Sequence, residues 1–456
     1  MRTVCYLRRR VGNSRHGCAP PAAPAQTGTV IVTIAGPSAL RGTVRVPGDK
    51  SISHRALMMA ALAPGTSRVT GLSDGDDVRR TLAAISALGA EVTDLDGVVE
   101  VTGGSLAEPV MTLDHGNSGT GIRLMTGIAA GLPFRTRLDG DDSVRSRPME
   151  RIATPLRLMG ARVEGRDGGY APLVVDGGGL RGIEYTTPVA SAQIKSAILL
   201  AGLSAEGMTT VHEPAVSRRH TEEMLAARGA PVVVEGTTTS VTPSTLSPLD
   251  TTVAADPSQA AFWLATAAAL PGSELTVPGV YLGPARRGFL DVLLRMGADL
   301  VIEQVSADSY DVTARGSALE ATDVEPGEVP GLVDEIPVLA VAAALAEGTT
   351  RFRGAGELRV KETDRLATVT AMLRALGVTV VEHPDGLDVT GGRLGGGTVD
   401  SFGDHRIAMA AAMAAVAARE PVTVLRFDAV ATSYPGFLDD LGSCAAGVVL
   451  DPGHDA

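Results

Sequence analysis

The chain has 456 residues, enough for roughly two to four domains, and 44% of them are hydrophobic, which is typical of a folded globular protein. Its formal charge of −12 and aromatic content of 3% argue against nucleic acid as a partner, because phosphate backbones recruit basic surfaces and single strands recruit aromatic side chains. The three cysteines form no CxxC pair, which disfavours structural zinc and a disulfide scaffold.

Residues 1–28 contain five arginines, and no acidic residue precedes Asp49. Arg-rich, acid-poor segments are typical of transit peptides, but no apolar segment follows this one. We therefore interpret residues 1–28 as a disordered extension. The longest apolar runs, 336–346 and 407–418, are shorter than the ~18 residues that span a bilayer, so we expect a cytoplasmic protein with no membrane partner.

From residue 29 onward one pattern repeats. An apolar helix is followed by a glycine turn, a short β-branched strand, a second helix that ends at a glycine, and a Val-rich strand. The glycines that mark the pattern are Gly65 and Gly89, Gly207 and Gly229, Gly272 and Gly297, and Gly348 and Gly377. The second glycine of each pair is expected just after a helix end. The pattern predicts an α/β (α+β) fold of β-α-β-α-β-β units, and it is weakest over the polar stretch 235–252.

Five turns lead into predicted helices that carry a cation near their start. They are residues 47–51 before Arg55, 116–120 before Arg123, 145–148, 359–365 and 403–406. Helix N-termini present free N–H groups and a positive dipole end, so each turn is a candidate anion site. Pro148 suits the first position of the helix after the third turn. A solvated arginine explains any one turn, but five in one chain favour anion binding.

Two other patterns are incomplete. Residues 42–51 resemble a P-loop, but Asp49 separates Gly48 from Lys50 where that motif requires Gly-Lys. Asp404-His405 lacks a second histidine at metal-ligand spacing, so we predict no metal site there.

The segment 361–377 is the most informative of the five. Lys361, Glu362 and Arg365 lie around the start of its predicted helix, since side chains three and four residues apart are neighbours. A carboxylate between two cations is either part of a salt-bridged surface turn or a group that exchanges protons with a substrate. Upstream, Asp334 precedes a buried helix, where it is either an N-cap or a general base.

Taken together, these segments resemble the EPSP synthase (3-phosphoshikimate 1-carboxyvinyltransferase) family, in the family's order, from about Val30 to Leu441. The matching segments are PGDKSISHRAL (47–57), GNSGTGIRL (116–124), RSRP (145–148), SAQIKSAILLAGL (191–203), SRRHTEEML (217–225), DEIP (334–337), RVKETDR (359–365), GDHRIAM (403–409) and TSYPGF (432–437). The resemblance implies two similar domains of three β-α-β-α-β-β units each, with the active site in the cleft between them. It places residues 29–46 plus 255–456 in one domain and residues 47–254 in the other.

The resemblance also implies the reaction. The enolpyruvyl group of phosphoenolpyruvate is transferred to the 5-hydroxyl of shikimate 3-phosphate and phosphate is released, by a monomer without metal or organic cofactor. Asp334 would be the general base, Glu362 would protonate and later deprotonate the methylene carbon, and Lys50 would stabilise the developing charge. The residues implied to bind the substrates are Lys50, Ser51, Arg55, Gly119, Thr120, Arg147, Ser191, Gln193, Arg218, Asp334, Lys361, Arg365, His405 and Arg406.

Two positions depart from the family pattern. Ala192 stands where a second serine often follows Ser191, so one phosphate contact is lost or is supplied by Arg218. Thr432 stands where some members carry a lysine, which leaves open one contact to phosphoenolpyruvate.

Two alternative functions are weighed against this one. A UDP-N-acetylglucosamine enolpyruvyl transferase would share the fold but begins its motif with Lys-Asn, whereas this chain has Lys50-Ser51. A non-catalytic repeat protein that binds phosphorylated ligands would not need Glu362. The chain has only three lysines, all within matching segments. The third, Lys195, lies beside Gln193 and is open between a structural ion pair and a functional role.

Overall fold

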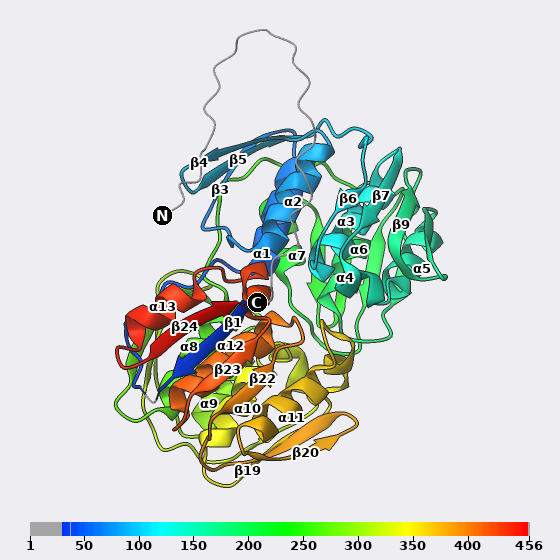
Figure 1. The fold of residues 1–456 in the computed structure, drawn as a ribbon. Coiled ribbons are helices and arrows are strands. Elements are labelled where there is room, and N and C mark those ends of the chain that lie inside the picture. Colours follow the sequence, from blue (N-terminus) through cyan, green and yellow to red (C-terminus); the bar gives the residue numbers. More distant parts are fainter. Residues whose placement is uncertain (1–29, 37, 455–456) are drawn as a thin grey trace.

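The structure is a computed structural model that describes residues 30–36 and 38–454, so the predicted extension at residues 1–28 lies outside the described residues. The described residues form six four-stranded sheets. Three of them, with strands between residues 65 and 252, form the upper domain in Figure 1, and the other three, with strands at residues 30–43 and 274–454, form the lower domain. The predicted α/β class with two similar domains is confirmed.

All six sheets repeat one arrangement, shown by the second sheet of the upper domain. Its elements in chain order are β6 (Leu113–Asp114), α3 (Gly119–Gly131), β7 (Arg135–Asp139), α4 (Asp142–Ser146), α5 (Glu150–Met159), β8 (Arg162–Arg166) and β9 (Tyr170–Asp176). β6 runs parallel to β7, β7 is antiparallel to β9, and β9 is antiparallel to β8. This is the β-α-β-α-β-β unit that the sequence pattern predicts, with one short helix, α4, added.

The other two units of the upper domain follow the same plan. The strands of the first, in sheet order, are β14 (Thr251–Thr252), β3 (Gly65–Thr70), β5 (Val98–Gly103) and β4 (Glu91–Leu95), with helices α1 (Lys50–Leu62) and α2 (Asp76–Ala87). The strands of the third are β10 (Glu184–Thr186), β11 (Thr209–His212), β13 (Thr238–Val241) and β12 (Val232–Glu235), with helices α6 (Ala192–Gly202) and α7 (His220–Ala227).

The lower domain contains three further sheets. Their strands, in sheet order, are β2 (Arg41–Thr43), β15 (Glu274–Tyr281), β17 (Ser309–Arg315) and β16 (Asp299–Gln304); β18 (Asp323–Val324), β19 (Thr349–Phe352), β21 (Gly386–Thr390) and β20 (Thr379–His383); and β22 (Gly397–Asp400), β23 (Val422–Leu425), β1 (Val30–Ala35) and β24 (Val449–His454). The helices are α8 (Pro257–Ala269), α9 (Gly288–Arg295), α10 (Ile336–Leu345), α11 (Arg365–Ala375), α12 (His405–Ala417) and α13 (Phe437–Cys444), with 3-10 turns η1 (Val329–Gly331), η2 (Gly356–Val360) and η3 (Phe427–Thr432).

The chain passes between the domains twice, and each passage delivers a strand to the domain it is leaving. β2 precedes α1 in sequence but pairs with β15 of the lower domain, whereas β14 precedes α8 but pairs with β3 of the upper domain. The two passages meet where Gly48 and Ala255 form an antiparallel bridge. The polar stretch 235–252, where the sequence pattern is weakest, leads into the second passage.

Each domain has its own hydrophobic core. In the upper domain the core includes Leu57, Leu124 and Ile198, on α1, α3 and α6. In the lower domain it includes Trp263 on α8 and Met409 on α12, together with most of α10. These central helices are buried on nearly every side, because their sequences are apolar around the whole circumference.

The four helix-ending glycines are confirmed. Gly89, Gly229, Gly297 and Gly377 each follow a helix with φ between 81° and 101°, a conformation that only glycine adopts without strain. Three local expectations need correction, beginning with Pro148, which is not the first residue of a helix because α5 starts at Glu150 after the N-cap Met149.

The other two corrections concern the lower domain. Asp334 is not an N-cap, because Glu335 occupies that position before α10. Lys361 and Glu362 lie outside the helix that the sequence predicted over 361–377. α11 begins only at Arg365, where the carboxylate of Asp364 caps the first turn.

Candidate active site

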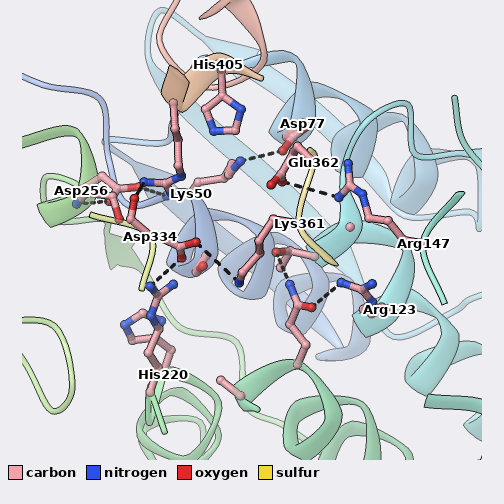
Figure 2. A pocket seen from close by; sticks show the side chains of 18 of the residues that line it. Lys50, Asp77, Arg123, Arg147, His220, Asp256, Asp334, Lys361, Glu362 and His405 are labelled. Carbon is pink, nitrogen blue, oxygen red and sulfur yellow. Dashed lines mark hydrogen bonds and ion pairs between the residues drawn. The ribbon is translucent and has the colours of Figure 1, made fainter. Parts of the chain in front are cut away.

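Helix N-termini of both domains meet at one cavity (Figure 2). α1, α3 and α6 of the upper domain and α8 and α12 of the lower domain place residues of their first turn in its wall. The lining residues are Lys50, Ser51, Arg55, Asp77, Gly119, Thr120, Arg123, Arg147, Arg151, Ala192, Gln193, Arg218, His220, Asp256, Ser258, Arg286, Asp334, Val360, Lys361, Glu362, His405 and Arg406. Nine of these are Lys or Arg and four are Asp or Glu, so the cavity is suited to bind several negative charges.

The structure brings most of the predicted site residues together. Of the fifteen that the resemblance implied, thirteen line this cavity. Ser191 lies instead in a neighbouring groove that shares Gln193 and Arg218 with the cavity. Arg365 is only 1% exposed and lies behind the wall, where it holds other side chains of the site.

Lys50 is fixed at both its backbone and its side chain. It is the first residue of α1, and its N–H donates to the carboxylate of Asp256, the N-cap of α8, at 3.1 Å. Its ammonium pairs with Asp77 in the first turn of α2 at 2.8 Å (Figure 2). Burial raises the pKa of Asp77 above its usual value, and the charge of Lys50 offsets only part of this rise. The start of α1 is thereby tied to helices of both domains.

Asp334 is surrounded by cations from both domains. Its Oδ2 accepts a hydrogen bond from Arg218 of the upper domain at 2.7 Å. Its Oδ1 lies 3.6 Å from the Lys361 ammonium and 3.3 Å from Arg365. Burial opposes ionisation, but Lys361 and three arginines, Arg406, Arg218 and Arg365, hold the pKa of Asp334 well below its usual range. The group is therefore a carboxylate at neutral pH and can accept a proton.

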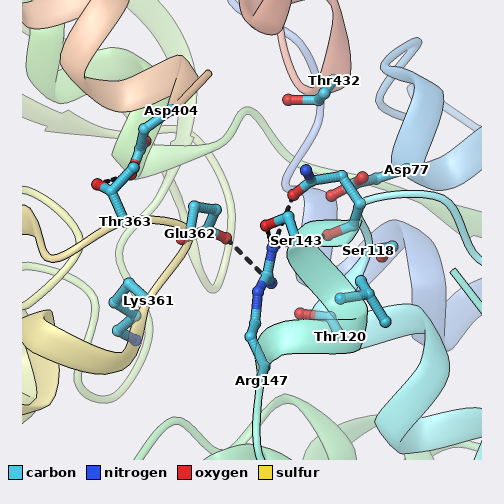
Figure 3. Close-up of polar contacts among 12 residues, drawn as sticks. Asp77, Ser118, Thr120, Ser143, Arg147, Lys361, Glu362, Thr363, Asp404 and Thr432 are labelled. Carbon is cyan, nitrogen blue, oxygen red and sulfur yellow. Dashed lines mark hydrogen bonds and ion pairs between the residues drawn. The ribbon is translucent and has the colours of Figure 1, made fainter. Parts of the chain in front are cut away.

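Glu362 lies between arginines of the two domains, and Figure 3 shows its pair with Arg147 of the upper domain. Its Oε2 accepts a hydrogen bond from Arg365 at 2.5 Å, and its Oε1 is 3.5 Å from Nη1 of Arg147. Burial again opposes ionisation, yet Arg365 and Arg147, with His405 and Lys50, hold the pKa of Glu362 well below its usual range. An anion that takes over Arg147 would therefore raise the pKa of Glu362.

Gly119, the first residue of α3, lies against two arginines. A Cβ at this position would come within 2.6 Å of Nη1 of Arg147 and 3.3 Å of Nη1 of Arg123. Arg123 donates to the side-chain oxygen of Gln193 at 2.6 Å, and Gln193 donates in turn to Thr120 at 3.0 Å. Burial lowers the pKa of Arg123 to about 9, so the guanidinium remains charged at neutral pH. This corner joins α3 to α6.

Arg55 joins α1 to α6 and α7. Its guanidinium donates to the carbonyl of Ser51 and to the hydroxyls of Ser196 and Thr221, at 2.7 to 2.9 Å. Burial lowers the pKa of Arg55 to about 10, so it stays charged at neutral pH. Its hydrogen-bond partners are neutral, which leaves the charge available to an anion.

Two neutral histidines complete the wall. His220 starts α7 and His405 starts α12, and burial, assisted by neighbouring cations, lowers the pKa of both well below 6.5. Within the described residues, neither ring nitrogen of His220 and not Nε2 of His405 finds a hydrogen-bond partner. The resemblance implied that His405 binds substrate, and the structure places its side chain in the cavity wall.

Nine lining residues are outside the predicted set: Asp77, Arg123, Arg151, Ala192, His220, Asp256, Ser258, Arg286 and Val360. The local sequence could have identified Asp256 as a helix N-cap, because Asp-Pro is typical of an N-cap followed by the first helical residue. Asp77 and Arg286 had none, since their partners lie far away in sequence. Thr432, at the position that departs from the family pattern, donates its hydroxyl to the carbonyl of Ala429.

The described part of the chain holds no group of three or more His, Cys, Asp or Glu side chains arranged to bind a metal ion. Among residues 30–36 and 38–454 there is also no helix with the length and apolar character needed to cross a membrane.

Comparisons with known proteins agree with one another. The family model described as EPSP synthase (3-phosphoshikimate 1-carboxyvinyltransferase) matches residues 34–441. The chain is 51% identical over 415 residues to the 3-phosphoshikimate 1-carboxyvinyltransferase of Gloeobacter violaceus, which covers 88% of this chain and 96% of that protein. It is 47% identical over 411 residues to the protein of the same name from Alkaliphilus metalliredigens, with coverage of 88% and 97%.

Solved structures show the same similarity. The EPSP synthase from Acinetobacter baumannii superposes with a TM-score of 0.83 at 39% identity, over 93% of this chain and 100% of that chain. The enolpyruvyl transferase NikO from Streptomyces tendae superposes with a TM-score of 0.77 at 21% identity, over 94% of this chain and 100% of that chain, and so shares the fold.

Proposed function

The chain belongs to the EPSP synthase family, and from that premise we propose how its cleft carries out the family's reaction. The enzyme transfers the enolpyruvyl group of phosphoenolpyruvate to the 5-hydroxyl of shikimate 3-phosphate and releases phosphate, in the shikimate pathway of aromatic amino-acid biosynthesis. The observation that carries this assignment to the cleft is the pair of ionised carboxylates, Asp334 and Glu362, in a wall that holds nine Lys and Arg side chains.

The upper domain binds shikimate 3-phosphate. Ser51 and Arg55 hold its phosphate from α1, and Ser191, Gln193 and Arg218 complete this subsite from α6 and the loop before α7. The neutral partners of Arg55 support the proposal, because they leave its charge to the phosphate.

Phosphoenolpyruvate binds across the cleft. Gly119 and Thr120 at the start of α3 and Arg147 provide one side, and Arg406 with His405 at the start of α12 provides the other. The crowding at Gly119 supports this proposal, because a backbone without Cβ lets a phosphate approach the N–H groups of α3 beside Arg147. Arg365 acts from behind by holding Glu362 and Asp334 in place.

The chemistry proceeds by addition and elimination. Asp334 accepts the proton of the 5-hydroxyl as its oxygen bonds to C2 of phosphoenolpyruvate, while Glu362 donates a proton to the methylene carbon. Glu362 then removes a proton from the resulting methyl group, and the C2–O bond to phosphate breaks. Lys50 stabilises the charge that develops on the phosphate oxygens, and Lys361 orients shikimate 3-phosphate beside Asp334.

Glu362 must be protonated to act as the acid. In the structure, Arg147, Lys50 and neighbouring groups lower the pKa of Glu362. The phosphate and carboxylate groups of the two substrates would pair with these cations. Neutralising those cations raises this pKa, so substrate binding itself prepares the acid.

We further propose that residues 29–46 plus 255–456 form one domain and residues 47–254 the other. Separate cores and the bridge between Gly48 and Ala255 support these boundaries. The domains close on the substrates, and ion pairs such as Arg151 with Glu357 at 3.4 Å span the closed cleft.

Phosphate release is the direct test. Purified protein is incubated with phosphoenolpyruvate and either shikimate 3-phosphate or UDP-N-acetylglucosamine, and free phosphate is measured. We expect phosphate with shikimate 3-phosphate alone. Release only with the sugar nucleotide would indicate the alternative transferase, and release with neither would indicate a binding protein.

We also propose that the enzyme acts as a monomer in the cytoplasm, because one chain supplies every residue assigned above. Light scattering during size-exclusion chromatography should give the chain mass of 46.7 kDa. A mass of twice that value would contradict the proposal.

A further inference from the structure

A buried charge cluster lies beneath the upper-domain wall and has no part in the mechanism above. Lys195 on α6 is 2% exposed, and its ammonium donates to Glu213 at 2.6 Å and pairs with Glu222 on α7 at 2.7 Å. Both glutamate side chains are equally inaccessible. The sequence left Lys195 open between an ion pair and a function, and the ion pair is confirmed. Its position indicates a function as well.

The cluster continues to the residue before Arg218. Ser217 donates its hydroxyl to the second carboxylate oxygen of Glu213 at 2.6 Å. Lys195, Glu213 and Ser217 therefore form a continuous hydrogen-bonded chain from α6 to the loop 213–219. This loop has no regular secondary structure, and it carries Arg218 into the cavity.

Arg218 depends on this anchor. Among the described residues, the hydrogen-bond partner of its guanidinium is Asp334, which belongs to the lower domain. Within the upper domain, the position of Arg218 relative to α6 is set by the backbone of its loop, and Ser217 fixes that backbone through Glu213.

A second set of hydrogen bonds between α6 and α7 lies beside the ion pairs of Lys195. Ser196, the next residue of α6, hydrogen bonds to Thr221 at 2.6 Å, and both hydroxyls accept hydrogen bonds from Arg55. Consecutive residues of α6 thus pair with consecutive residues of α7. Lys195 pairs with both buried carboxylates, and the attraction between unlike charges is strong where water is excluded.

We propose that Lys195 is a positioning residue for the shikimate 3-phosphate subsite, which sets the distance between Arg218 and the first turn of α6 through Glu213 and Ser217. This rests on the proposed function. Lys195 does not itself line the cavity, so its effect on substrate is indirect. Ser191 and Gln193 lie at the start of α6, the helix that carries Lys195. The ammonium of Lys195 therefore links these two residues to the loop that carries Arg218.

The test separates the two substrates. Lys195→Met should raise the KM for shikimate 3-phosphate tenfold or more while the KM for phosphoenolpyruvate stays within about threefold, because the displaced loop carries Arg218 and not Arg147. A role in stability alone would lower the Tm and leave both KM values unchanged, or raise them equally. Either of those results would overturn the proposal.

Lys195→Met leaves two buried carboxylates without their shared cation, and this variant can fail to fold. Ser217→Ala keeps the ion pairs and releases only the loop, so it should raise the KM for shikimate 3-phosphate about threefold to tenfold while lowering the Tm less than Lys195→Met does. Ser217→Thr restores the hydroxyl and should restore most of the affinity.

Ser204→Ala is the matched control, since Ser204 lies just after α6 at the end away from the cavity and donates only to a nearby carbonyl. Its KM values should equal those of the wild type. Unchanged KM values in Ser217→Ala would overturn the proposal. Wild-type protein that releases no phosphate from shikimate 3-phosphate would instead overturn the function on which it rests.

Discussion

At the scale of single residues, the central feature is that two arginines that we propose to bind the substrates also hold the carboxylates. Arg147 contacts Glu362, and Arg218 contacts Asp334, each across the cleft. A carboxylate that pairs with a substrate-binding arginine must give up that partner when an anionic substrate arrives. With the proposed roles, substrate binding therefore also changes the proton affinity of these carboxylates.

Glu362→Gln tests the acid–base role. The amide keeps the shape of the side chain but cannot carry a proton to carbon, so kcat should fall by on the order of 10²-fold or more, with a smaller change in either KM. Steady-state phosphate release measures both quantities. Glu347→Gln, at an exposed position of the same domain, should behave as the wild type. Full turnover in Glu362→Gln would remove this residue from the mechanism.

Gly119→Ala tests the close approach at α3. The new Cβ would meet Nη1 of Arg147 at 2.6 Å, and Arg147 is held by Asn117 at 2.8 Å and by Ser143 at 2.6 Å, so its guanidinium must leave a fixed position. We expect the KM for phosphoenolpyruvate to rise about tenfold, equivalent to ~1.4 kcal/mol, while the Tm hardly changes.

The control for this substitution is Gly392→Ala. Gly392 is exposed and has open space around its Cβ position, so the KM for phosphoenolpyruvate should stay at the wild-type value. A wild-type KM in Gly119→Ala would show that Arg147 can move without loss of binding.

Five turns could be predicted as anion sites because each leads into a helix, whereas the individual site residues and their roles came from the resemblance. Lys50, Arg147 and Glu362 all belong to these turns, and the free N–H groups and positive dipole of a helix N-terminus connect a turn of this kind to anion binding. Asp77 could not be predicted, because its partner Lys50 is 27 residues away and no local pattern links an ordinary acidic helix start to it.

At the scale of helices and strands, Arg286 joins three helix starts. It is 3% exposed and donates to Asp49 at 2.8 Å and to Asp256 at 2.9 Å, which are the N-caps of α1 and α8. Glu335, at the N-cap position of α10, lies 3.6 Å away and also accepts a hydrogen bond from Ser258. Burial opposes the charge, but the surrounding carboxylates raise the pKa of Arg286.

Arg286→Met should destabilise the protein by about 3–5 kcal/mol, because it leaves buried carboxylates without their cation. Urea unfolding measures this change. Arg287→Met is the matched control: its side chain is about half exposed and pairs with Asp291 on the surface, so it should change stability by less than ~1 kcal/mol. Equal stability of the two variants would show that the three helix starts do not need Arg286.

The units themselves could be predicted from the sequence, because apolar helices and glycine helix ends recur at similar spacing. The pairing of β2 with β15 and of β14 with β3 could not be predicted from this pattern, and the expected domain of each strand rested on the resemblance alone. These strands are only three and two residues long, too short to show an alternating pattern, and their pairing is set by the path of the chain. The early helix start predicted at Lys361 was wrong because Asp364 caps α11 three residues later.

At the scale of the whole molecule, four buried histidines link stability to pH. Burial lowers the pKa of His115 to about 4, and burial with neighbouring cations lowers those of His54, His220 and His405 well below 6.5. In the unfolded chain all four take up protons as the pH falls through about 6.5, whereas in the folded protein they remain neutral. The unfolded state is then favoured by acid.

The free energy of unfolding should therefore be highest well above pH 6.5 and should fall by roughly 1.4 kcal/mol for each of these histidines between pH 7.5 and 5.5. Urea unfolding at several pH values measures this change. His115→Gln should make the dependence shallower by one histidine's share. A stability that is constant over this range would contradict the prediction.

The pairing of β1 with β24 sets an order of events during synthesis. Val32 lies opposite Val424 and Val30 lies opposite His454, so β1 lacks both of its neighbours until β23 and β24 have been made. At ~5–20 residues per second, the ribosome needs roughly 20–80 s to make the intervening chain. The upper domain has all its strands once β14 emerges, well before that. β1 must therefore remain unpaired on both sides while the whole upper domain folds, and its sheet is the last of the described sheets to be completed.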